Sequence, residues 1–191
     1  ARRGFKVTTD EKELVQAICS RLDNLPLAIE LAAARLKVLS LRDLHLQLNK
    51  TLDGLVDRRS DQHARQRTLR STLDWSWRLL TSEEQEILSQ ISVFHGGFSL
   101  PAAEHILRLS RECNILDVLE SLHEKSLLNV IEMDDAPDGL RFRALDMVRE
   151  YGEEQLGRRG QLDAMRARHQ DFYLGLTEGL VQSMFTTIEV Q

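Results

Sequence analysis

One β-hairpin signal interrupts a chain whose 191 residues otherwise follow the apolar spacing of helices. Residues 127–131 and 140–144 are rich in branched and aromatic side chains, and the turn-forming stretch 134–139 lies between them. Four helical segments precede this pair of strands from residue 68 onward, and another helix follows it. This order of elements is typical of a winged-helix module with a single wing.

The pattern as a whole predicts a mainly α fold, in which a small helical bundle precedes a winged-helix domain with one β-hairpin. The predicted domains are a helical bundle at 1–50, a polar linker at 51–66, the winged helix at 67–157 and a long helix at 158–191 that could begin a helical-repeat domain. The middle helix of the bundle is apolar on nearly every side, as expected for a central helix. In the last helix an apolar stripe contains Leu162, Met165, His169, Phe172, Leu176 and Leu180.

The charge pattern argues against strong binding to nucleic acid. The formal net charge is −5, and phosphate neutralisation by cations supplies most non-specific affinity for nucleic acid. The helix before the hairpin would enter the major groove of DNA, yet it carries Asp117, Glu120 and Glu124 against one cation, Lys125. The wing adds four acids, and two arginines offset them only in part: Glu132, Asp134, Asp135 and Asp138 against Arg141 and Arg143. We therefore expect little direct DNA binding by this wing.

No catalytic motif is present. The sequence has no glycine-rich loop with a lysine to hold phosphates, no dinucleotide-binding fingerprint and no Cys/His spacing that fits zinc. The chain is therefore not expected to be an enzyme or to bind metal. Because no apolar run approaches the roughly 20 residues that span a bilayer, and no signal peptide opens the chain, we expect a cytoplasmic protein without a membrane partner. It starts without Met and in mid-pattern, which suggests a piece of a longer protein.

Four motifs, in order, resemble the STAND signalling ATPases, a class that includes NB-ARC proteins and large bacterial transcriptional regulators. Residues 24–36 (NLPLAIELAAARL) resemble the G-L-P-L-A helix of that class, and residues 68–80 resemble its L-x-x-S-[YW]-x-x-L helix. Residues 93–98 (VFHGGF) and 141–151 (RFRALDMVREY) resemble its V-F-x-G-G-F segment and its M-H-D region. The resemblance covers roughly residues 10–175.

This resemblance implies an ADP or ATP site shared with an upstream P-loop domain that the present sequence lacks. Pro26 would pack against the adenine ring, with Leu25 and Leu27 shaping the turn, although starting a helix explains Pro26 equally well. Asp146 would help to hold the ADP-bound state. The sequence departs from the family at Leu145, where many relatives have a histidine that reaches the phosphate, because leucine cannot donate a hydrogen bond.

The leading hypothesis is therefore the regulatory part of a nucleotide-dependent switch in a bacterial transcriptional regulator, with a separate DNA-binding domain as output. Its main partner would be the upstream P-loop domain, and self-assembly is a further interaction left open. Two alternatives remain: a winged-helix transcription factor domain that binds DNA directly, and a protein-interaction scaffold. The inducer, the oligomeric state and the group that replaces a sensor histidine at Leu145 do not follow from the sequence.

Overall fold

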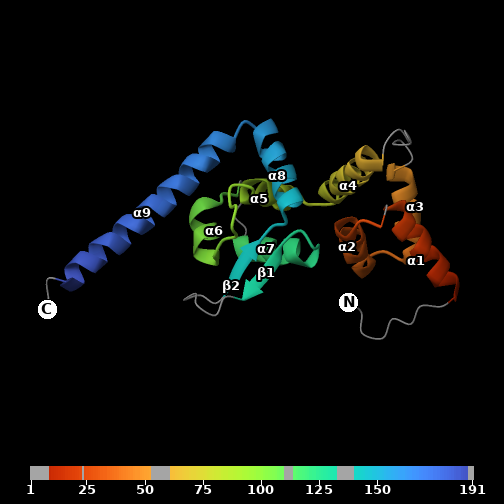
Figure 1. The fold of residues 1–191 in the computed structure, drawn as a ribbon, viewed down its shortest axis with the longest axis horizontal. Helices are drawn as coiled ribbons and strands as arrows, with labels where there is room; N and C mark the ends of the chain where they lie inside the picture. The colour runs from red at the N-terminus through yellow and green to blue at the C-terminus, as the bar shows by residue number, and fades with distance from the viewer. Residues whose placement is uncertain (1–8, 23, 53–60, 110–113, 133–139, 189–191) are drawn as a thin grey trace. The chain divides into compact units, whose positions relative to one another are not determined.

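The computed structural model confirms the predicted fold class, a mainly helical protein with a winged helix and a two-stranded antiparallel hairpin (Figure 1). It describes residues 9–22, 24–52, 61–109, 114–132 and 140–188. The chain divides into two compact units. The first contains residues 1–81 with 124–127, and the second contains residues 82–123 with 128–191.

The first unit is a bundle of short helices. Its elements are α1 (Thr9–Arg21), α2 (Pro26–Ala34), the 3-10 helix η1 (Arg35–Lys37), α3 (Leu41–Leu52) and α4 (Asp61–Arg78). Helix α1 packs against α3, and α2 packs against α4. The core contains leucines from α2, from α3 and from the position directly after α1, all almost completely buried: Leu31, Leu44, Leu48 and Leu22. Burial of such side chains contributes about 1.5–3 kcal/mol each, which offsets the weak stability of short isolated helices.

Helix α4 begins at Asp61, so it includes residues that the sequence analysis placed in the linker. Residues 61–66 are polar but contain no Pro or Gly, so nothing in their backbone preference stops a helix there. The remaining linker residues 53–60 lie outside the described part of the chain. The helix also belongs to the first unit rather than to the winged helix, because it packs on α2 and α3. Close to this contact, the Cζ atom of Arg35, the first residue of η1, lies 5.9 Å from the ring centroid of Trp75 on α4.

The second unit contains the winged helix and the long last helix. Its elements are α5 (Ser82–Ile91), α6 (Leu100–Ile106), α7 (Ile115–Glu124, whose last residue is grouped with the first unit), β1 (Asn129–Glu132), β2 (Leu140–Arg143), α8 (Asp146–Arg158) and α9 (Leu162–Ile188). Helices α5 and α8 pack closely. Gly152 makes this approach possible, since a Cβ there would lie 2.8 Å from the Leu88 carbonyl oxygen.

The wing is tied to the helical body by a backbone pairing that the sequence did not predict. Phe98 and Phe142 form an isolated antiparallel bridge, with both N–H groups donating to the opposite carbonyl at 2.8 Å. The bridge adds a third short segment beside β2, while β1 pairs with β2 on its other side. Phe98 is completely buried, so the bridge fixes the hairpin to the core that α5, α6 and α7 form.

Helix α9 follows its predicted stripe in its first half and leaves the unit in its second half. Met165 is buried, and His169 and Phe172 are half-buried against the winged helix. Leu176, by contrast, is 48% exposed, and the Leu180 side chain lies outside the described residues. Figure 1 shows α9 running past α6 and away from the other elements of its unit.

Candidate functional site

The predicted adenine-binding turn is an exposed helix start in the first unit. Asn24 has a positive φ of 53°, and Leu25 is the extended residue that precedes α2, with Pro26 at its first position. Pro26 is exposed, whereas Leu25 and Leu27 are half-buried. The packing of Pro26 against an adenine ring stays a prediction. The three residues offer no side-chain ligand for a phosphate.

Asp146 is exposed at the first position of α8, in the second unit. The residue before it, Leu145, occupies the N-cap position without any side-chain cap hydrogen bond. A carboxylate in the first turn is stabilised by the helix dipole, but it also repels an approaching phosphate. Asp146 and the Leu25–Leu27 turn belong to different units, so their convergence on one nucleotide stays a prediction.

The exposed face of α7, which would enter the major groove, is acidic. Val118, Leu119 and Leu122 are buried and anchor the helix in the core. On the solvent side, the exposed residues of α7 are Asp117, Glu120, His123 and Glu124. The Ser121 hydroxyl donates to the buried Glu84 carboxylate at 2.7 Å, which fixes α7 to α5. The helix therefore presents carboxylates where a DNA-reading helix normally presents donors and cations.

The hairpin places two arginines on one face of the wing. In its register Asn129 lies opposite Arg143, and Ile131 lies opposite Arg141. The side chains of Arg141 and Arg143 lie on the opposite face of the hairpin from the buried Phe142, because successive residues of a strand alternate between faces. Arg143 is exposed, whereas Arg141 is half-buried and donates from Nη2 to the Gly97 carbonyl oxygen at 2.9 Å. The predicted wing acids Asp134, Asp135 and Asp138 lie outside the described residues.

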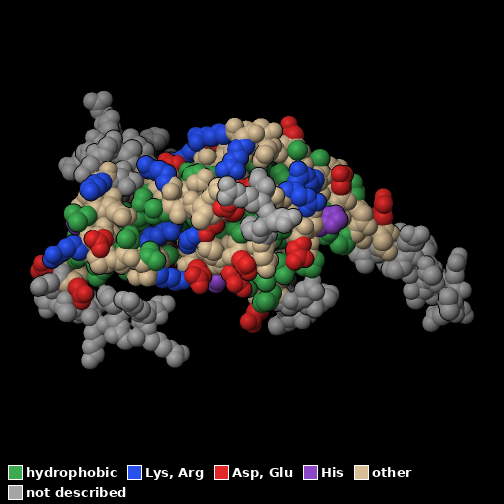
Figure 2. Space-filling model, turned by 180° about the vertical axis from the view of Figure 1, so that it is seen from behind, with side chains coloured by type: hydrophobic (Ala, Val, Ile, Leu, Met, Phe, Trp, Pro, Cys, Tyr) green, Lys and Arg blue, Asp and Glu red, His purple; other side chains and the backbone are tan. Residues whose placement is uncertain are grey.

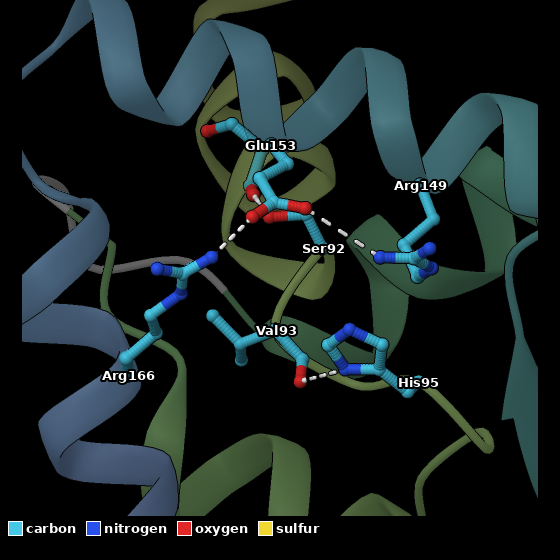
Figure 3. Close-up of polar contacts among 7 residues, drawn as sticks. Ser92, Val93, His95, Arg149, Glu153 and Arg166 are labelled. Carbon is cyan, nitrogen blue, oxygen red and sulfur yellow. Dashed lines mark hydrogen bonds and ion pairs between the residues drawn. The ribbon is translucent and has the colours of Figure 1, made fainter.

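A polar cluster that the sequence analysis missed joins α8 to α9 (Figure 3). The Glu153 carboxylate is paired with Arg149 on its own helix, at 3.6 Å, and with Arg166 of α9. His95, from the loop after α5, lies beside this cluster, and its Nδ1 is 3.3 Å from the Val93 carbonyl oxygen. The i,i+4 spacing of Arg149 and Glu153 was visible in the sequence, but the partner on α9 is set by tertiary packing.

Neither a metal site nor a membrane-spanning helix is found in the described ranges. No group of three or more His, Cys, Asp or Glu side chains there is arranged to hold a metal ion. None of the helices described combines the length and the apolar character that a bilayer crossing requires.

Comparison with known proteins defines the class of the second unit. Residues 80–157 match the family described as a winged helix-turn-helix domain, and the order α5, α6, α7, β1, β2, α8 agrees with it. The chain therefore contains a winged helix-turn-helix domain. No solved structure matches the chain.

Three mycobacterial proteins are similar to almost the whole chain. "Putative HTH-type transcriptional regulator Rv0890c" of Mycobacterium tuberculosis is 37% identical over 179 residues, which are 93% of this chain and 20% of that protein. Mb0914c of Mycobacterium bovis carries the same description and shows the same identity and coverage. "Uncharacterized protein Rv0894" of Mycobacterium tuberculosis is 31% identical over 169 residues, which are 88% of this chain and 43% of that protein. The chain thus spans about a fifth of the length of the first two relatives.

Proposed function

We propose that this chain is the winged-helix portion of a bacterial transcriptional regulator. The observation that carries the proposal is the winged helix-turn-helix match over residues 80–157, within a similarity that covers 93% of the chain and extends to relatives named as transcriptional regulators. Of the functions weighed from the sequence, these comparisons favour the winged-helix DNA-binding alternative over the nucleotide switch.

The charges indicate which part of the domain would contact DNA. The exposed carboxylates of α7, Asp117 and Glu120, would be repelled by phosphates. Arg143 is exposed on the wing, and Arg141 lies on the same face. Wing residues of winged-helix proteins contact the DNA backbone, and backbone contacts position a protein without selecting a sequence. We therefore propose that Arg143 and Arg141 of the wing contact phosphates, although the four acids of the wing limit the net attraction, and that α7 does not read bases in the major groove.

Fluorescence anisotropy with a labelled DNA duplex at low salt tests this mode of binding. Arg143→Ala is expected to weaken binding about three- to tenfold, because one phosphate contact is lost. Arg42→Ala is the matched control, since Arg42 is an exposed arginine on α3 of the other unit, and it should leave affinity unchanged. Glu120→Lys should have little effect if α7 stays away from DNA.

Three results would count against wing binding. If Arg143→Ala and Arg42→Ala weaken binding equally, the attraction is a general effect of charge rather than a wing contact. If Glu120→Lys strengthens binding more than tenfold, α7 approaches the phosphates, and the DNA interface has to be moved from the wing to the helix. Complete lack of binding by the unsubstituted chain would leave protein contacts as the function of this winged helix.

A nucleotide-dependent switch is a second proposed function, supported by the exposed Pro26 in the turn that resembles the STAND class. A version of the protein extended upstream of Ala1 through a P-loop domain would be titrated with fluorescent ADP. Pro26→Ala should weaken binding, and Asp146→Ala should speed ADP release. Asp163→Ala is the control for Asp146, because both are exposed acids in the first turn of a helix. Failure of the extended protein to bind either ADP or ATP would remove this function.

A further inference from the structure

His169 connects the long helix α9 to the aromatic core of the winged helix. Its imidazole makes an edge contact with Phe94, at 5.2 Å between ring centroids and an interplanar angle of 70°. It also lies 4.8 Å from the Tyr173 ring one turn further along α9. His169 is half-buried. Aromatic pairs at these separations contribute about 0.5–1.5 kcal/mol beyond area burial, so this ring is part of what holds α9 in place.

The contact continues from Phe94 to the wing. Phe94 stacks on Phe98 at 4.5 Å, and Phe98 stacks on Phe142 of β2 at 5.6 Å. An unbroken series of rings therefore runs from α9 through the loop after α5 to the hairpin. A second contact on α9 pairs Phe172 with His105 of α6 at 4.9 Å. Loss of the His169 contact would expose the Phe94 ring, which is the first phenylalanine of this series on the side of α9.

One titratable side chain from another segment acts on His169, namely His95 in the loop after α5. His105 of α6 contacts Phe172, one turn further along α9. Helix α8 is joined to α9 through the Glu153 carboxylate, which is shared between Arg149 and Arg166. A proton on His169 would add a positive charge to a half-buried ring that His95 already disfavours as a cation.

Burial lowers the pKa of His169 below its ordinary value of 6.5, and the neighbouring His95 lowers it further. The neutral ring is therefore favoured while α9 is docked, and the released helix binds the proton more tightly than the docked helix. By linkage, docking is at full strength above pH 6.5 and weakens as the pH falls from 6.5 through the lower pKa of the docked state.

We propose that His169 is a proton-operated latch, which holds α9 on the winged helix when its imidazole is neutral and releases α9 when the imidazole is protonated. The latch goes beyond the proposed function and does not depend on it. The ring contacts with Phe94 and Tyr173 carry the proposal, because they half-bury an imidazole that is more costly to keep there when it is charged.

Hydrogen–deuterium exchange of the backbone amides at 165–173 measures the docking of α9 in the chain as it is. After correction for intrinsic exchange rates, protection should fall about threefold or more between pH 7.5 and pH 5.5. His169→Gln replaces the ring by a polar side chain that does not titrate, so protection should become independent of pH. His105→Gln is the matched control, since it removes the other histidine of the α9 contact, and the pH dependence should persist.

A second measurement keeps the proposal testable if His169→Gln does not fold. Proton NMR of the His169 ring in the unsubstituted chain should give a midpoint below 6.5, and His95→Gln should move that midpoint upward. The latch is excluded if the midpoint is at or above 6.5. It is also excluded if protection at 165–173 is independent of pH in the unsubstituted chain, or if His105→Gln rather than His169→Gln abolishes the dependence.

Discussion

Among the glycines that the structure describes, Gly97 combines a positive φ with a backbone contact too close for a Cβ. Its φ is +86°, and a Cβ at this position would lie 2.8 Å from the Phe142 carbonyl oxygen. That same oxygen accepts the hydrogen bond of the Phe98 N–H. A side chain at 97 therefore meets two costs at once, a left-handed backbone conformation and the disruption of the bridge that holds the wing.

We predict that Gly97→Ala lowers the free energy of unfolding by about 2–3 kcal/mol. Gly96→Ala provides the comparison, because a Cβ on Gly96 would have no neighbour within 4 Å, and its effect should stay within about 0.5 kcal/mol. Urea unfolding followed by circular dichroism measures both variants. Equal stabilities of the two variants would show that the Phe98–Phe142 bridge contributes little to the fold.

At the scale of elements, the sequence predicted the patterns that are local. The β1–β2 hairpin and α7 were expected at nearly the observed residues, because alternating strands around a turn and apolar residues at helical spacing are short-range signals. The start of α4 was placed too late, since polarity was taken as a sign of a linker where no helix breaker occurs. The Phe98–Phe142 bridge joins residues 44 positions apart, and no local sequence pattern predicts such a pairing.

The candidate sites also include features that local sequence patterns predict and features that only tertiary packing determines. Pro26 lies at the helix start that the sequence predicted, and it is exposed. Asp146 is also exposed, in the first turn of α8. The stripe of α9 was identified from spacing, but the contact of His169 with Phe94 depends on a loop from another part of the chain. Spacing alone also treats His169 as one more core position. Its significance comes from the neighbouring His95, whose approach is a consequence of tertiary structure.

At the scale of the whole molecule, charge limits how the chain can engage DNA. The formal net charge of −5 opposes approach to a polyanion at long range. On the face drawn in Figure 2, Lys and Arg side chains are interspersed with Asp and Glu. Attraction must then come from a small local group of cations, and on the wing this group consists of Arg141 and Arg143. A contact of this size releases few counterions.

We therefore predict a shallow salt dependence for DNA binding by the whole chain. Two phosphate contacts correspond to a slope of about −2 in a plot of log K against log salt concentration, and Arg143→Ala should reduce it to about −1. Anisotropy titrations at several salt concentrations measure both slopes, with Arg42→Ala expected to keep the original value. A slope steeper than about −5 would require many more phosphate contacts than the wing provides. The DNA interface would then have to include cations outside the hairpin, and the proposal that binding is limited to the two wing arginines would be wrong.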